Sequence, residues 1–379
     1  MMNKKLGLYI HIPFCNRVCP YCDFHKMVAS DELKEKYIKA LIKESNLKGI
    51  SKYDLSTLYI GGGTPSSLKM DLLEMLFSSL DKEINLKNLL EFTFECNPED
   101  ISVELLTLLK KYNVTRLSIG IQTLNESFQH HINRVFSYEK LSTVVRLLNK
   151  FNFSNYSFDL MYGFLNQTIY DIKSDIDKLV SFNPTHISIY SLIVEEHTIF
   201  GKLMRDGMVL ESSDEEQAKE YLFIIDYLKK FGYHQYETSN FAKMGFESKH
   251  NLIYWDHDEY LCLGSGASSF YNNVRSVTTT SIHNYINNLN NDLLPDVDSE
   301  LLDFEDITDE FVMMALRKNK GIDTLEFYNK FGVDIYEYYP NVSYLLDKGI
   351  IEQKSHYLSI KKEFRYVANS VIVKFISDF

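Results

Sequence analysis

The chain has 379 residues, of which 45% are hydrophobic and 24% are charged, as is usual for a soluble globular protein. Its formal net charge of −12 argues against charge-driven binding of nucleic acid. No stretch reaches the roughly 18 apolar residues that a membrane-spanning helix needs. We therefore expect a cytoplasmic protein with no nucleic-acid partner, and peripheral contact with a membrane stays open.

Short apolar runs alternate with helical patterns through the first half of the chain. This alternation predicts βα units and a parallel sheet, and so an α/β fold. Six units are fewer than the eight of a closed β/α barrel, which favours an open, incomplete barrel. The strands are expected at residues 6–12, 55–60, 90–96, 116–121, 156–161 and 186–191.

Three of the five cysteines lie within eight residues, at Cys15, Cys19 and Cys22, directly after the first predicted strand. Their spacing suits a cubane iron–sulfur cluster in which the protein binds three irons and the fourth stays open. A closed Cys3His zinc site that includes His25 is an alternative, as are buried inert cysteines. The odd cysteine count in a long chain without a secretory signal disfavours a disulfide framework.

Polar or glycine positions follow the next predicted strands, at the end of the barrel where such folds place their chemistry. They are the glycine run 61–63, Glu95, Gln122 and Asp159. Asp159 or Gln122 could bind ribose hydroxyls, and Glu95 could accept from an ammonium group. Arg134 could pair with a carboxylate. Together these groups suit a nucleoside that carries an amino acid.

The pattern changes after the sixth strand, and we expect three domains, at 1–195, 196–300 and 301–379. The middle segment should contain a helix at 213–231 and a loop or linker at 284–291. The last unit should contain a helix at 304–318, a hairpin formed by 349–352 and 357–360, and a terminal helix at 367–376.

The segments YIHIPFC (9–15), CPYC (19–22) and GGGTP (61–65) resemble the radical S-adenosylmethionine (SAM) proteins of the coproporphyrinogen dehydrogenase-like group. The resemblance covers nearly the whole chain. It implies a partial (β/α)6, TIM-like radical SAM barrel and a smaller HemN-type C-terminal domain, helical and winged-helix-like. It also implies a [4Fe–4S] cluster bound by the three cysteines. The SAM contacts that it implies are Tyr9, Tyr21, Gly62, Gly63, Thr64, Glu95, Gln122, Arg134 and Asp159.

Two features favour the HemW-type haem chaperones within this group. Phe24 stands where the true dehydrogenase has a further cysteine, and that enzyme has a longer extension before its first strand. The segment HNLIYW at 250–255 matches the HNxxYW motif of the chaperones. The resemblance therefore implies a haem site made of His250, Asn251, Tyr254 and Trp255.

The chemistry of these residues also supports a haem site, because imidazole is a common axial ligand of haem iron and aromatic rings pack against porphyrins. A histidine beside aromatic residues can equally be a hydrogen-bonded core residue, so that alternative stays open for His250. Cys262 could supply a thiolate ligand, but a small buried side chain is the better interpretation.

The function implied is binding of haem and its delivery to apoproteins, such as respiratory or storage haemoproteins, with the cluster and SAM retained. An electron donor such as flavodoxin or ferredoxin is compatible with this function. The alternative is an oxygen-independent coproporphyrinogen III dehydrogenase, in which a 5′-deoxyadenosyl radical starts oxidative decarboxylation of propionates. A zinc-stapled nucleic-acid-binding module is a third hypothesis, which the acidic composition disfavours.

Overall fold

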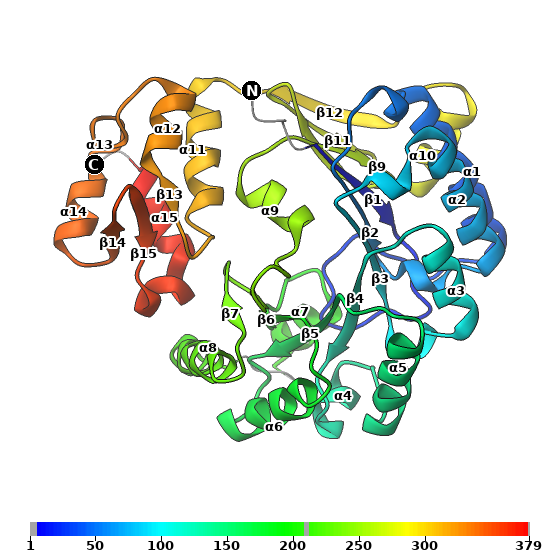
Figure 1. The fold of residues 1–379 in the computed structure, drawn as a ribbon, viewed down its shortest axis with the longest axis horizontal. Helices are drawn as coiled ribbons and strands as arrows, with labels where there is room; N and C mark the ends of the chain where they lie inside the picture. Colours follow the sequence, from blue (N-terminus) through cyan, green and yellow to red (C-terminus); the bar gives the residue numbers. More distant parts are fainter. Residues whose placement is uncertain (1–5, 208–211, 378–379) are drawn as a thin grey trace.

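Six parallel strands form the centre of the fold in the computed structural model, which describes residues 6–207 and 212–377 (Figure 1). Each strand pairs with the next along the chain, in the order β1 to β6. All six lie within two residues of their predicted positions, which confirms the predicted partial barrel. The strands are β1 (Gly7–Ile12), β2 (Thr57–Gly62), β3 (Glu91–Cys96), β4 (Arg116–Gln122), β5 (Tyr156–Tyr162) and β6 (His186–Ser191).

Helices connect these strands and cover the outer face of the sheet (Figure 1). In α5, Leu141, Val144 and Leu148 are buried at the spacing of one helical face. The Ser102 side chain caps α3 by accepting from the amide of Leu105. The helices are α1 (Asp31–Lys48), α2 (Met70–Glu83), α3 (Val103–Lys111), α4 (Glu126–His131), α5 (Tyr138–Lys150) and α6 (Ile169–Val180).

The chain after β6 extends the sheet at both of its edges. β9 (Tyr260–Leu263) pairs in parallel with β1, and β10 (Ser268–Tyr271), β11 (Val274–Thr278) and β12 (Asp296–Leu301) continue that edge. β8 (Asn240–Ala242) and β7 (His234–Gln235) lie beyond β6. The helices of this segment are α7 (Ile199–Arg205), α8 (Asp214–Lys229), α9 (Lys249–Trp255) and α10 (Ile282–Asn290).

The prediction of a loop or linker at 284–291 is wrong, because α10 occupies most of that stretch. Its buried residues Ile282, Tyr285 and Leu289 lie on one face, which packs on α1. The ring of Tyr285 stacks on Tyr37 at 5.0 Å, and its hydroxyl donates to Glu44 at 2.5 Å. Apolar residues at helical spacing outweigh the poor helix propensity of the asparagines between them.

The C-terminal unit has a hydrophobic core of its own, drawn from residues between Phe311 and Phe375. The larger core draws on residues from Leu6 to Leu289, and thus on both of the first two predicted domains. The domain limits remain a prediction. The unit contains α11 (Phe304–Ala315), α12 (Thr324–Phe331), α13 (Ile335–Tyr338), α14 (Asn341–Asp347), α15 (Ala368–Ile376), β13 (Ile322–Asp323), β14 (Ile351–Lys354) and β15 (Tyr357–Ile360).

The predicted hairpin is present in this unit as the antiparallel pair β14 and β15. β13 joins β15 to complete a three-stranded sheet. Among all the helices described, none combines the length and the apolar character needed to cross a membrane.

Candidate functional site

The loop that follows β1 carries the three clustered cysteines. Its base is closed by two backbone hydrogen bonds, from the amide of Cys15 to the carbonyl of Met27 at 2.9 Å and from the amide of Met27 to the carbonyl of Pro13 at 2.7 Å. None of the three cysteines forms a disulfide, and each is half-buried. These two bonds join the beginning and the end of the cysteine loop.

The glycine run after β2 packs directly against the end of β1. Gly62 has a φ of +115°, and a Cβ there would lie 2.5 Å from the ring of His11. A Cβ on Gly63 would lie 2.8 Å from the backbone oxygen of Phe14. The amide of Thr64 donates to that oxygen at 2.8 Å, and its hydroxyl donates to the sulfur of Cys15 at 3.5 Å. These glycines are therefore needed for protein packing as well as for access to the cavity.

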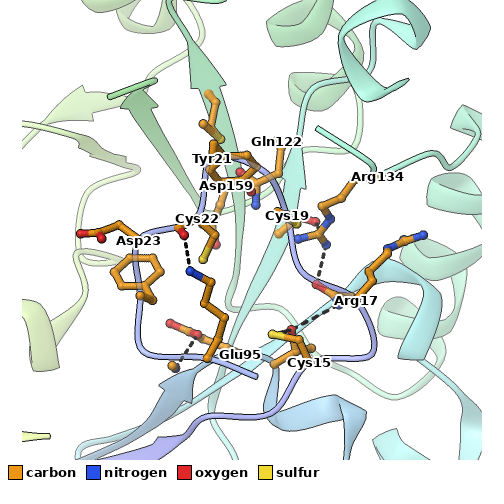
Figure 2. Close-up of a pocket in the computed structure, with 18 of the residues that line it drawn as sticks. Cys15, Arg17, Cys19, Tyr21, Cys22, Asp23, Glu95, Gln122, Arg134 and Asp159 are labelled. Atoms are coloured by element: carbon orange, nitrogen blue, oxygen red, sulfur yellow. Dashed lines mark hydrogen bonds between the residues drawn. The ribbon is translucent and has the colours of Figure 1, made fainter. Parts of the chain in front are cut away.

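A cavity of about 820 Å³ opens at the carboxyl ends of the six strands, and the cysteine loop forms part of its wall (Figure 2). Eleven of the twelve residues assigned to the cluster and SAM line this cavity. They are Cys15, Cys19, Tyr21, Cys22, Gly62, Gly63, Thr64, Glu95, Gln122, Arg134 and Asp159.

The twelfth, Tyr9, is not part of the cavity wall. Its hydroxyl lies 3.0 Å from Nδ1 of His11, whose Nε2 lies 2.8 Å from the carbonyl oxygen of His25 in the cysteine loop. His11 is buried, and burial lowers its pKa to about 4. A neutral His11 therefore joins Tyr9 to the base of the cysteine loop.

Two carboxyl groups form the floor of the cavity. Glu95 accepts from the hydroxyl of Tyr59 at 2.6 Å and from the amide of Gly62 at 3.2 Å. Asp159 accepts from the hydroxyl of Ser118 at 2.9 Å. Burial raises the pKa of both carboxyls, that of Glu95 to about 7. Such groups can accept from the hydroxyl or ammonium groups of a ligand.

Sequence reasoning missed Tyr59, Ser118 and Tyr190, which also line the cavity. Ser118 lies two residues before Gly120, which also lines the cavity. Alternate residues of a strand share a face, so this spacing was a signal in the sequence that could have found Ser118.

A β-bulge in β4 turns Gln122 towards the cavity. The pairing of β4 with β5 shifts register between Gly120 and Gln122, and Gln122 has a φ of +69°. Bulges of this kind re-aim side chains beside functional sites. Arg134 lies nearby and donates to the side-chain oxygen of Asn97 at 2.5 Å and to the carbonyl of Gly120 at 3.0 Å. Its guanidinium can pair with a carboxylate.

The donor set fits an iron–sulfur cluster. Burial raises the pKa of the Cys15 and Cys22 thiols, while the positive charge of Lys26 favours both thiolates. Arg134 adds to this effect at Cys15. Metal ligation deprotonates thiols, so nearby cations stabilise the anionic site that results. The cavity wall thus supplies three sulfur ligands together with room for a second, nucleoside-sized group.

His25, which a Cys3His zinc site would need as a ligand, points away from the three cysteines. Nε2 of His25 lies 3.1 Å from the hydroxyl of Ser265, and the His25 ring stacks on His11 at 5.7 Å. Within residues 6–207 and 212–377, no three histidine, cysteine or acidic side chains form a group that could hold a single metal ion.

The HNxxYW motif lies at the opposite end of the barrel from the cysteines. It forms α9, which contacts β2 and β3. The amide of His250 donates to Glu91 at 3.0 Å, and its ring lies 2.7 Å from the hydroxyl of Thr57. Glu91 and Thr57 are the first residues of their strands. The two assigned ligand sites therefore do not share a cavity.

The ring of His250 is fully buried. Its Nδ1 faces Thr57, and its Nε2 lies 2.8 Å from the hydroxyl of Tyr254. Burial, with the charge of Arg116, lowers the pKa of His250 to about 3, so the ring is neutral at physiological pH. In this conformation the histidine is a hydrogen-bonded core residue.

The other aromatic residues of the motif face different neighbours. Tyr254 packs edge-on against Tyr260 at 4.6 Å, and the ring of Trp255 lies 5.9 Å from the guanidinium of Arg317. The indole N–H of Trp255 is buried and has no hydrogen-bond partner within the described parts of the chain. The backbone N–H of Asn251 donates to the hydroxyl of Ser248 at 3.4 Å. Asn251, Tyr254 and Trp255 are half-buried, whereas His250 is fully buried.

Cys262 is buried in β9, as expected for a small core side chain. Burial raises the pKa of its thiol to about 12, which disfavours the thiolate form. We do not assign it a ligand role.

The raised pKa of Glu95 generates a prediction for the cofactor-free protein. Between pH 4.5 and about 7 the unfolded chain loses this proton while the folded protein keeps it, so stability falls as pH rises. Replacement by glutamine removes this contribution. As pH rises from 4.5 to about 7, we expect the free energy of unfolding of Glu95→Gln to rise by roughly 3 kcal/mol relative to that of the parent protein.

Urea denaturation of both proteins at several pH values measures this difference. Burial also raises the pKa of Glu237 to about 7. This carboxyl is present in both proteins, so its contribution cancels in the stability difference. A stability difference that stays constant with pH would contradict the prediction.

Comparison with known proteins agrees with this geometry. Residues 9–179 match the radical SAM superfamily, and residues 302–366 match the HemN C-terminal domain. The solved structure of coproporphyrinogen III oxidase (HemN) from Escherichia coli has the same fold, with a TM-score of 0.84 at 20% identity, over 99% of this chain and 90% of that one.

Two curated relatives match this chain over nearly their whole length. The heme chaperone HemW of Lactococcus lactis is 35% identical, over 100% of this chain and 99% of the relative. The heme chaperone HemW of Bacillus subtilis is 34% identical, over 98% and 99% respectively. The chain therefore belongs to the HemW family of the radical SAM superfamily.

Proposed function

We propose that this protein is a cytoplasmic haem chaperone that binds haem and delivers it to apoproteins, among them respiratory or storage haemoproteins. The observation that carries the proposal is the end-to-end similarity to relatives that are named heme chaperones. The cysteine-lined cavity supports a resident [4Fe–4S] cluster and SAM beside that function.

In this proposal Cys15, Cys19 and Cys22 would bind the cluster from the wall of the cavity, and SAM would occupy the rest of the cavity. Arg134 would pair with a carboxylate, and Glu95 would accept from an ammonium group. Asp159 and Gln122 would bind ribose hydroxyls. A cluster with SAM at its open iron supplies one-electron chemistry at the sulfonium. The electron would come from a small donor protein such as a flavodoxin or ferredoxin.

Tyr9 has a different role in this proposal from the one that the family resemblance implied. Its hydroxyl contacts His11, which contacts the carbonyl of His25. We assign Tyr9 the task of positioning the cysteine loop rather than contacting SAM.

Phe24 supports the chaperone over the dehydrogenase. It borders the cavity and is 71% exposed, at the position where the dehydrogenase has its further cysteine. A phenylalanine side chain has no thiol, so it cannot replace that cysteine chemically. We therefore expect no turnover of coproporphyrinogen III.

Replacement of one cluster cysteine tests the resident cofactor. We expect Cys19→Ala to lose nearly all bound iron and sulfide after anaerobic reconstitution, because two thiolates do not hold a cubane with three protein-bound irons. Cys262→Ala is the matched control, since this thiol is buried in β9 away from the cavity. It should keep the cluster. Equal iron and sulfide contents in both variants would refute the assignment.

Titration of the reconstituted full-length protein with haem tests the proposed function. We expect a stable complex with a distinct Soret band and transfer of its haem to an apoprotein acceptor such as apomyoglobin. Incubation with coproporphyrinogen III, SAM and a reductant is the counter-assay. Failure to bind haem, together with decarboxylation of the porphyrinogen, would overturn the proposal in favour of the dehydrogenase.

A further inference from the structure

The helix that carries the haem motif lies between the barrel and the C-terminal unit (Figure 1). We propose that α9 acts as a latch. It must leave its position at the base of the barrel before His250 can bind haem iron, and charged residues of the C-terminal unit, in α11 and directly after it, hold it closed. This inference rests on the proposed haem-binding function, whose regulation it describes.

The inner side of α9 is held by strand residues at the base of the barrel. The carboxylate of Glu91 accepts from the amide of Lys249 at 3.1 Å, the amide of His250 at 3.0 Å and the hydroxyl of Ser248 at 3.3 Å. The hydroxyl of Thr57 lies 2.7 Å from the His250 ring. The contacts of His250 and Ser248 are buried, and a buried hydrogen bond is costly to leave unmade, whereas the contact of Lys249 is only partly buried.

The outer end of α9 is held by charged residues of the C-terminal unit. Lys318, which follows α11, contacts the carboxylate of Asp256 at 2.5 Å. Glu310 of α11 lies 3.3 Å from Nε2 of His257. Asp256 and His257 directly follow α9, so the C-terminal unit adds two charged contacts at this end of the helix, where the ring of His257 also packs on Phe270 of β10 at 4.7 Å. We call the Asp256–Lys318 ion pair the clamp.

His250 cannot bind haem iron while α9 occupies its present position at the base of the barrel. A neutral imidazole has one nitrogen lone pair, and haem iron needs that lone pair and an open approach to it. Both ring nitrogens of His250 already face hydroxyls, of Thr57 and Tyr254, and the ring is fully buried. Haem can therefore reach His250 only in molecules whose α9 has moved out of this position.

The apparent haem affinity then depends on the fraction of open molecules. Both clamp residues are partly shielded from solvent, with 15% of the Lys318 side chain and 33% of the Asp256 side chain exposed. Loss of such a pair costs about 1 kcal/mol, which corresponds to a roughly fivefold change in the equilibrium. We expect Asp256→Asn and Lys318→Met to bind haem about fivefold more tightly than the parent protein.

Lys219→Met is the matched control. It breaks an ion pair with Glu215 in α8, away from α9, and replaces the same side chain in the same way. Haem titrations of all four full-length proteins, followed at the Soret band, measure the effect. The control should match the parent protein.

Hydrogen exchange of the haem-free proteins gives a second measurement, independent of haem. The amides of residues 249–256 should exchange about fivefold faster in both clamp variants than in the parent protein and the control. Adding haem to the parent protein should also make these amides exchange faster.

The possible results separate the inference from the function on which it rests. Equal haem affinity and equal exchange in clamp variants and control would overturn the latch, while haem binding by the parent protein would leave the chaperone function intact. A parent protein that binds no haem would overturn the proposed function, and the latch with it.

Discussion

The close contact between the glycine turn after β2 and the end of β1 determines where the three cysteines lie. A side chain on Gly62 would collide with His11, and one on Gly63 would collide with the backbone of Phe14. Because both positions lack a Cβ, the amides of Gly63 and Thr64 can bond to the carbonyls of Ile12 and Phe14. The cysteine loop therefore starts against the wall of the cavity.

The barrel has two chemically different ends, and one residue of β2 lies between them. The hydroxyl of Tyr59 donates to Glu95 at the cavity floor, and its ring lies 5.2 Å from the ring of His250. Thr57, two residues earlier in the same strand, contacts His250 directly. A single strand thus supplies contacts to both assigned sites.

Much of the fold and of the cavity could be predicted because each signal was local. A buried parallel strand is a short apolar run, and its carboxyl end is followed by the residues that reach the mouth of the barrel. The cysteines, Glu95, Gln122 and Asp159 all follow this rule. Tyr9 lies inside a strand rather than after it, and its hydroxyl contacts His11.

The placement of α9 was beyond such reasoning, because it depends on contacts distant in sequence. Nothing near His250 in the sequence indicates that Glu91 accepts from its backbone amide or that Lys318 pairs with Asp256. The helix α10 was missed for a different reason. Its asparagines suggested a loop, whereas the burial of Tyr285 against α1 decides the structure.

In the proposed site, three thiolates would leave one iron of a cluster open to SAM in this cavity. Electron paramagnetic resonance of the anaerobically reduced protein, recorded with and without SAM, tests this arrangement most directly. We predict the signal of a reduced [4Fe–4S] cluster whose g values shift when SAM is added. A reduced protein without this signal, or with the same spectrum in both samples, would contradict the account.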